Sequence, residues 1–215
     1  MDKGQISIAK KSQAKEIFSR FVQNKAAVVG LIIILVFVSF ALFPELFARY
    51  GYDDQDLSRQ FLPPSWEHPF GTDDYGRDIF SRVVYGSRIS LVIGVFSITF
   101  SCAVGVLIGS VAGYYSSTID NILMRAMDIM LAMPSILLAI AIVAAMGVGF
   151  QNLIIAIGVA SIPQYARIVR ASVLSIKDQE YIEAARSIGA SNLRIIFHHI
   201  LPNCLAPIIV QATMS

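Results

Sequence analysis

Four side chains between residues 68 and 78 are of the types that hold metal ions in proteins. His68, Asp73, Asp74 and Asp78 offer one imidazole and three carboxylates within a single short segment. Their spacing does not match that of a calcium-binding loop. Asp and Gly residues at this density are typical of a tight turn. We therefore predict a turn followed by a helix from about Asp78, and no metal site.

A second polar segment, residues 173–203, lies between two strongly apolar stretches and has the pattern of a helix, a turn and a second helix. Asp178 is expected to cap a helix that starts near Gln179, because its carboxylate can accept from free backbone N–H groups. Glu180 and Glu183 fall in the early turns, where negative charge suits the helix dipole. A polar element of this kind between apolar stretches is suited to docking a partner.

The turn in this segment is expected at Gly189, since glycine commonly ends a helix with a positive φ. Ala184 and Ala185 favour helix and, with Gly189, are small enough to let another surface approach closely. Ser191 can cap the second helix, and Pro202 is expected to reset the chain before it re-enters the membrane. A DNA-binding helix–turn–helix also uses Gly at its turn, but membrane spans on both sides argue against it.

The distribution of charge indicates the elements that position these segments. The chain is 55% hydrophobic and only 15% charged, against about 25% charged in soluble domains. Residues 26–44, 89–119 and 129–166 contain no Asp, Glu, Lys or Arg. A bilayer core requires roughly 20 apolar residues of helix, so the first two runs are one span each and the third is about twice as long as needed. Residues 147–152 near its middle are typical of a turn between two spans.

These runs predict an all-α polytopic membrane protein with four consecutive regions. We expect a cytoplasmic arm with an amphipathic helix in residues 1–25, a first span in 26–48, an external loop in 49–88 and the core of the fold in 89–215. The last apolar run begins at Asn203 and is too short to cross a bilayer. We therefore expect the sequence to be truncated within a fifth span.

Lys and Arg residues predict the orientation. The arm before the first span and the loop after the fourth hold most of them, and Arg125, in the expected loop between spans two and three, lies on the same side. The side richer in Lys and Arg is cytoplasmic. The N-terminus and residues 173–203 are therefore predicted inside. The net charge of +2 gives no reason to expect a nucleic-acid partner.

The predicted spans contain no group of side chains suited to catalysis, and no cofactor is expected. Arg167 and Arg170 fall at the cytoplasmic end of span four, where their side chains can reach water. Ion-coupled carriers usually place ionisable residues at mid-membrane, and the cores of spans one to three have none. Pro134 and Pro163 lie inside spans three and four, where each can kink its helix or line a pathway.

The polar segment resembles a signature of ATP-binding-cassette importer permeases, the EAA motif. The matching residues are Glu183, Ala184, Ala185 and Gly189, followed by Leu201-Pro202. The coupling loop that the resemblance implies also includes Arg186, Ala190 and Ser191. Where that pattern has an Ile two places before Leu-Pro, this chain has His199. Motifs nearer the N-terminus are similar to the C-type subunit of the dipeptide, oligopeptide and nickel branch: His68-Pro69-Phe70-Gly71-Thr72-Asp73, Gly76-Arg77-Asp78, Ser81-Arg82, Tyr85-Gly86 and Arg88-Ile89-Ser90-Leu91.

The resemblance implies the type I importer permease fold, which has six spans in the family. It implies that two related permease subunits form a pathway, and that two ATPase subunits each receive an EAA coupling loop in a surface groove. A substrate-binding protein would deliver peptides, nickel or related small solutes from outside. ATP would be hydrolysed by the partner subunits, so this chain would not itself be an enzyme. Its location would be the bacterial or archaeal cytoplasmic (inner) membrane.

Two other classes of protein remain open. An ion-coupled secondary transporter would work without ATPase partners and would need charges at mid-membrane. A membrane-embedded enzyme would need a cluster of His, Asp, Glu or Ser within its spans. Co-purification with a nucleotide-binding subunit would separate the three classes.

Overall fold

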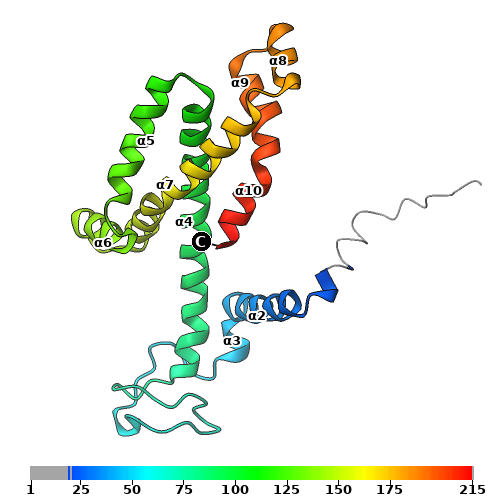
Figure 1. Cartoon of the computed structure of the whole chain (residues 1–215). Coiled ribbons are helices and arrows are strands. Elements are labelled where there is room, and N and C mark those ends of the chain that lie inside the picture. The colour runs from blue at the N-terminus through cyan, green and yellow to red at the C-terminus, as the bar shows by residue number, and fades with distance from the viewer. Residues whose placement is uncertain (1–18, 20, 215) are drawn as a thin grey trace, which may run out of the picture. The chain divides into compact units, whose positions relative to one another are not determined.

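The computed structural model describes residue 19 and residues 21–214, and the regular elements in that range are helices (Figure 1). The amphipathic helix predicted in the arm falls largely on residues 1–18 and 20, which lie outside the described residues. The chain divides into two compact units, residues 1–91 and 92–215.

The first unit begins with α2 (Lys25–Leu42), a strongly apolar helix. The side chain of Asn24 caps it by accepting from the third backbone N–H that follows, at 3.2 Å. The first span was predicted to run to residue 48, but α2 ends earlier. Pro44 cannot continue the helix and disfavours helical backbone in the residue before it, so the chain restarts in the short helix α3 (Pro44–Phe47).

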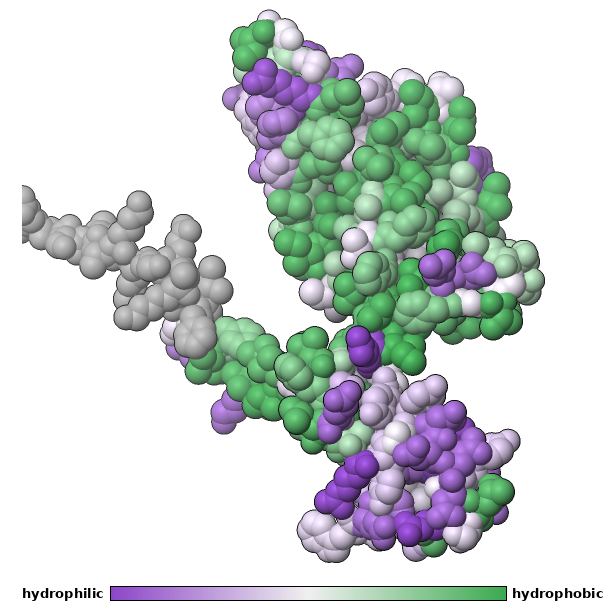
Figure 2. Space-filling view, turned by 180° about the vertical axis from the view of Figure 1, so that it is seen from behind, coloured by the Kyte–Doolittle hydropathy of each residue, from purple (hydrophilic) through white to green (hydrophobic). Residues whose placement is uncertain are grey.

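The segment between α3 and α4 (Ile79–Tyr114) has a largely hydrophilic surface, in contrast to the hydrophobic surface of the helices (Figure 2). It contains the 3-10 turn η1 (Leu57–Arg59). As predicted, a tight turn precedes the helix that starts at residue 79. Gly76 has a φ of 73°, and a Cβ at this position would lie 1.8 Å from the carbonyl oxygen of Asp56. Only glycine fits there without moving the backbone.

Two of the side chains weighed as metal ligands pair with each other inside this turn. Nδ1 of the buried His68 lies 3.0 Å from Oδ1 of Asp78. The other carboxylate oxygen of Asp78 accepts from the backbone N–H of Ser81 at 2.7 Å, which caps the start of α4. In the described part of the chain, no three His, Cys, Asp or Glu side chains are grouped so that they could hold a metal ion.

Asp73 is at the centre of the turn. Its Oδ1 accepts from the backbone N–H groups of Tyr75 and Arg77 at 2.9 and 3.0 Å, and its Oδ2 pairs with Arg77 and Arg82. Burial raises the pKa of this carboxyl, but the backbone donors and Arg77 outweigh it and hold the pKa at about 2, below its ordinary 3.8. The charge therefore stabilises the turn above pH 3.8, and this contribution is lost as the pH falls through about 2.

Replacing Asp73 by Asn is expected to loosen this turn. The amide keeps an oxygen for the backbone donors but loses the charge that faces Arg77 and Arg82, and hydrogen bonds to charged groups contribute about 1.5–3 kcal/mol. Amide hydrogen exchange in residues 71–78 should become roughly ten-fold faster or more at neutral pH. The difference from the wild type should shrink as the pH falls from 3.8 to about 2. Exposed Asp74, replaced by Asn as a matched control, should have little effect; equal effects would contradict the role of Asp73.

The second unit is organised by close contact between α4 and α7 (Phe150–Ile176). The hydroxyl of Ser101 donates to the carbonyl oxygen of Gly158 at 2.8 Å, and a Cβ on Gly109 would lie only 2.5 Å from the carbonyl oxygen of Ala166. Small residues occupy every fourth position along this face of α4. We call them the small-residue seam: Ser97, Ser101, Gly105, Gly109 and Gly113. Such residues let two membrane helices approach until their backbones touch.

Helices α5 (Ser117–Leu131) and α6 (Ser135–Met146) meet at a bend of 89°. Pro134 lies at the break, immediately before α6. Arg125 was predicted to lie in a loop between two spans, and this is wrong because it belongs to α5. Apolar residues that recur at helical spacing pack this helix against the core, so the segment is helical although it contains charged residues. These residues are Met124, Met127 and Met130.

A turn divides the third charge-free run, as predicted. It falls between α6 and α7, where Gly147 has a φ of 89°. The side-chain amide of Asn152 donates to the carbonyl oxygens of Met146 and Gly147, both at 3.0 Å. These bonds satisfy carbonyl groups that the end of α6 leaves without helical partners.

Two arginines of α7 pair with two acids of α5. A terminal guanidinium nitrogen of Arg170 lies 2.6 Å from Asp120, and one of Arg167 lies 2.6 Å from Asp128. The prediction that these arginines simply reach water was incomplete, because the segment taken for a loop is a helix that supplies their counter-charges. Pairing offsets part of the cost of removing such charges from water.

Four described helices are long and apolar enough to cross a membrane, or five if the bent α5–α6 pair is one span. They are α2, α4, α7 and a continuous helix over residues 192–214. The apolar run at the end of the chain was predicted to be too short to cross. In the structure this run is the last part of a helix that begins before it and is 23 residues long, which is enough to cross a bilayer by length and composition.

The helix over residues 192–214 passes through Pro202, which was expected to reset the chain. It consists of α9 (Asn192–Arg194), the π-helical turn η2 (Ile195–Ile200) and α10 (Leu201–Met214). Proline has no N–H to donate, and its ring crowds the preceding turn of an ordinary helix. The wider turn immediately before Pro202 gives that ring room, so the helix continues.

Candidate functional site

The polar segment between α7 and η2, residues 177–194, is called the α8 loop here. Its first helix, α8 (Glu180–Ser187), has Gln179 as its N-cap residue, without a side-chain hydrogen bond. Asp178 was predicted to be the cap, which places it one residue too early. A turn at the end of α7, in which the N–H of Gln179 donates to the carbonyl oxygen of Ile176 at 3.0 Å, contains Asp178 instead.

Gly189 ends α8 with a φ of 83°, as its position predicted. The N–H of Ala190 donates to the carbonyl oxygen of Ala185 at 3.1 Å, and that of Gly189 donates to Arg186 at 3.0 Å. This pair of bonds is the Schellman arrangement, which needs a left-handed residue at the glycine position. Ser191 then caps α9, also as predicted, by accepting from a backbone N–H at 3.4 Å.

One face of α8 packs against the chain's own core. Ile182 is fully buried and Ala185 nearly so. Ala185 was predicted to make room for a partner together with Ala184, but it faces inward. The core around Ile182 is built from the end of α7 and from the helix over residues 192–214: Val169, Val173, Ile195, Ile200, Cys204 and Ile208. A displacement of α8 would therefore press on both helices.

The end of α4 provides a second attachment for the loop. The hydroxyl of Tyr114 and Oδ1 of Asn192 are 2.8 Å apart, and the guanidinium carbon of Arg186 lies 5.9 Å from the centre of the Tyr114 ring. The latter contact is at the outer limit of a cation–π interaction. Sequence reasoning missed Tyr114, although a tyrosine that ends an apolar helix with a polar tip was a usable signal.

The opposite face of α8 and its turn are exposed. Ile188 is 86% exposed and Leu193 is 65% exposed, with Glu183 and Ala184 exposed beside them. Figure 2 shows hydrophobic atoms among hydrophilic ones in the region where Figure 1 places α8. Large apolar side chains that project from a polar loop are typical of protein contacts. The α8 loop therefore joins an exposed apolar surface to the ends of two long helices.

The two prolines predicted to kink or line a pathway lie in different surroundings. Pro134 is exposed at the α5–α6 bend, whereas Pro163 is fully buried inside α7. A pathway role for either stays a prediction.

Comparisons with known proteins agree with the resemblance seen in the sequence. Residues 105–215 match the family described as binding-protein-dependent transport system inner membrane component. Residues 12–64 match the family described as N-terminal TM domain of oligopeptide transport permease C.

Three curated proteins illustrate the similarity. The dipeptide transport system permease protein DppC of Alkalihalophilus pseudofirmus is 52% identical over 201 residues, which are 94% of this chain and 66% of that protein. The di/tripeptide transport system permease protein DppC of Pseudomonas aeruginosa is 44% identical over 215 residues, 97% of this chain and 71% of that protein. The oligopeptide transport system permease protein OppC of Bacillus subtilis is 42% identical over 210 residues, 97% and 69% respectively.

The chain thus spans about two thirds of the length of the first of these relatives and slightly more of the other two. Its helices, its apolar spans and the matched residues lead to one classification. This chain belongs to the family of binding-protein-dependent transport system inner membrane components, as a multi-pass membrane permease of the dipeptide and oligopeptide branch.

Proposed function

We propose that the chain is a permease subunit of an ATP-driven importer that takes up peptides delivered by an extracytoplasmic binding protein. The names of the relatives, which include dipeptide, di/tripeptide and oligopeptide permeases, support peptides as the cargo. The chain would form the translocation pathway together with a second, homologous permease subunit.

The α8 loop is the proposed contact with the ATPase subunits, one of two such contacts in the complex. The observation that carries this assignment is that one face of α8 is fixed to the chain's own core while the other is exposed. Ile182 is buried in the chain's own core, while Ile188 at the far end of the helix is 86% exposed. A helix fixed in this way can transmit a rigid-body movement of its partner to α7 and to the helix over residues 192–214. ATP would be hydrolysed in the partner, and this chain would contribute no catalytic residue.

The orientation proposed with this function places the N-terminus and the α8 loop in the cytoplasm of a bacterial or archaeal cell. The segment between α3 and α4 would face outward. The Lys and Arg residues of the arm and of the α8 loop support this orientation.

A single cysteine at position 188 tests both the contact and the orientation. In a chain whose Cys102 and Cys204 are replaced by Ala, Ile188→Cys should react with an impermeant thiol reagent in inside-out vesicles but not in intact cells. A bifunctional reagent should join it to an ATPase subunit of the assembled complex. Val148, which is fully exposed in the α6–α7 turn, provides the matched control as Val148→Cys. Labelling of residue 188 in intact cells, or no link to the ATPase, would contradict the proposal.

A further inference from the structure

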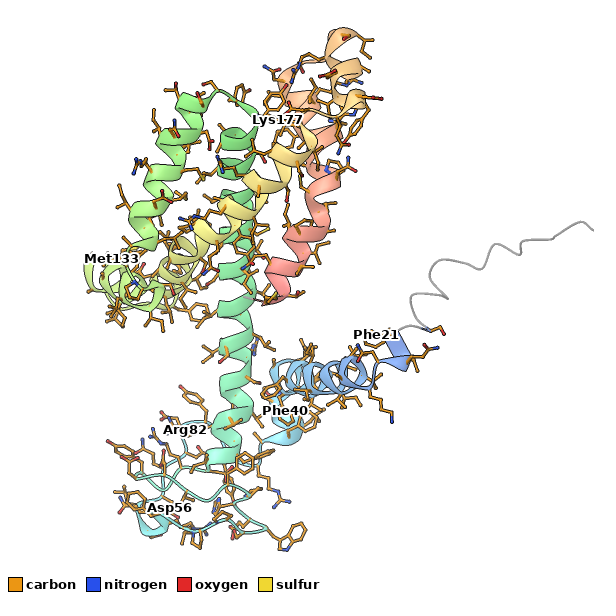
Figure 3. The ribbon with its side chains drawn as sticks, in the orientation of Figure 1. Phe21, Phe40, Asp56, Arg82, Met133 and Lys177 are labelled. Atoms are coloured by element: carbon orange, nitrogen blue, oxygen red, sulfur yellow. The ribbon has the colours of Figure 1, made fainter. Side chains whose placement is uncertain are left out.

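A cavity in the first unit combines aromatic and cationic side chains. Its volume is about 480 Å³, within the range of small-molecule sites. It lies where the beginning of α4 faces Tyr52 of the preceding segment, and Figure 3 labels Arg82 on the first turns of this helix. The residues that line it are Tyr52, Arg82, Tyr85, Gly86, Arg88 and Ile89.

The two arginines in this cavity have different surroundings. Arg82 forms an ion pair with Asp73 in the turn described above. Arg88, in contrast, has no ion-pair partner among the residues that the structure describes. It is also the last charge before the run of residues 89–119, which has none. Arg88 is exposed, so its guanidinium group is accessible to a ligand from outside the chain. Ionisable residues of membrane spans often mark the path of a substrate or ion.

The remaining walls suit a small organic anion better than a simple ion. The rings of Tyr52 and Tyr85 are 6.1 Å apart between centroids and inclined by 60°, which gives the cavity an aromatic side. A guanidinium group binds a carboxylate through two parallel N–H···O bonds. Gly86 leaves space open, because a Cβ at this position would meet no atom within 4 Å.

We propose that this cavity binds the carboxylate of a peptide cargo, with Arg88 as the group that binds the anion and the two tyrosines beside the rest of the peptide. The inference rests on the proposed function, since it takes peptides as the cargo. Lipid phosphate is the competing anion. The peptide is favoured because one of the lining residues, Tyr52, belongs to the hydrophilic segment before α4.

Occupancy can be measured without transport. In the assembled transporter with Cys102 and Cys204 replaced by Ala, Gly86→Cys introduces a thiol into the cavity and keeps Arg88. Millimolar dialanine should slow its reaction with a thiol reagent at least about three-fold, and the C-terminal amide of the same peptide should not. Adding Arg88→Gln should remove the protection. Gly94→Cys, on the same helix and also free of contacts within 4 Å, should show no protection. Equal effects of acid and amide, or no protection at all, would overturn the proposal and favour lipid phosphate.

Uptake provides a second and independent measurement. Complexes reconstituted with their ATPases and binding protein should take up dialanine about ten-fold more slowly, or slower still, with Arg88→Gln, because a charge-assisted contact is lost. Arg88→Lys, which keeps the charge, should recover part of the rate. If Arg88→Gln takes up dialanine as fast as an active wild-type complex, the proposed carboxylate site is overturned, but the proposed function is not. A wild-type complex that takes up no peptide would instead overturn the proposed function.

Discussion

Replacing Gly189 by Val, or Glu183 by Lys, is expected to abolish ATP-driven uptake while the complex stays assembled. Gly189 has a φ of 83°, and a Cβ added to it would meet no atom within 4 Å, so the effect of valine is backbone strain rather than collision. A left-handed conformation costs a non-glycine residue roughly 1–2 kcal/mol, and the branched Val more than Ala. The turn would therefore reopen, and Ile188 beside it would leave its position on the contact surface.

Glu183→Lys acts by charge in the same helix. Glu183 lies exposed in the first turn of α8, where a positive charge opposes the helix dipole by roughly 0.3–1 kcal/mol. The substitution also reverses the charge that the docking face presents. Neither residue is near the cavity around Arg88 in the sequence, and binding of the loaded binding protein should persist. Substrate-stimulated ATP hydrolysis and uptake in reconstituted vesicles should both fall to background.

Gly147 offers a matched control for the strain argument. It also has a positive φ, 89°, and no atom within 4 Å of an added Cβ, but it lies in the α6–α7 turn. Gly147→Val should lower thermal stability about as much as Gly189→Val and leave hydrolysis linked to uptake. If the two valine variants lose uptake equally, the loss comes from general destabilisation, and the α8 loop is only a connector.

The second large effect is expected at the small-residue seam. Gly109→Leu should prevent α4 and α7 from packing, because even its Cβ would lie 2.5 Å from the carbonyl oxygen of Ala166 and 2.8 Å from Cβ of Val169. Overpacking costs about 1–3 kcal/mol where side chains can move aside, and more where the obstacle is backbone. We expect little monodisperse protein after detergent extraction, and a lower unfolding temperature for whatever is recovered.

The same helix provides the control for this prediction. Gly94 has no atom within 4 Å of an added Cβ, so Gly94→Leu should leave yield and unfolding temperature near those of the wild type. Gly109→Ala should fall between the two. A Gly109→Leu protein as stable as Gly94→Leu would mean that α4 and α7 are not in backbone contact.

Local features of the fold could be predicted from the sequence because each depends on a few adjacent residues. The turn at Gly189, the cap at Ser191 and the turn at Gly147 follow from the conformational preferences of single residues. The helix start after Asp78 was predicted for the same reason. Asp178 was assigned wrongly because the end of α7 extends by one further turn, which local propensity does not reveal.

The errors concern features that depend on distant partners. The charges of α5 were taken as signs of a loop, since the arginines that neutralise Asp120 and Asp128 lie on α7 far along the chain. The small-residue seam was missed because the apolar runs were examined for length and charge, and not for small residues at a four-residue spacing. The inward position of Ala185 likewise depends on a core formed by two other helices.

The π-helical turn Ile195–Ile200 determines how α10, which follows it, is rotated about its axis. A wide turn of this kind holds one residue more than an α-helical path of the same rise would need, and each residue turns an α-helix by about 100°. The extra residue therefore sets which side of α10 is turned toward the core, where Cys204 and Ile208 are buried. Deleting one residue here would keep the hydrogen bonds of a helix but rotate that pair out of the core. The number of residues in this turn thus determines which face of α10 is turned toward the core, whatever side chains the turn contains.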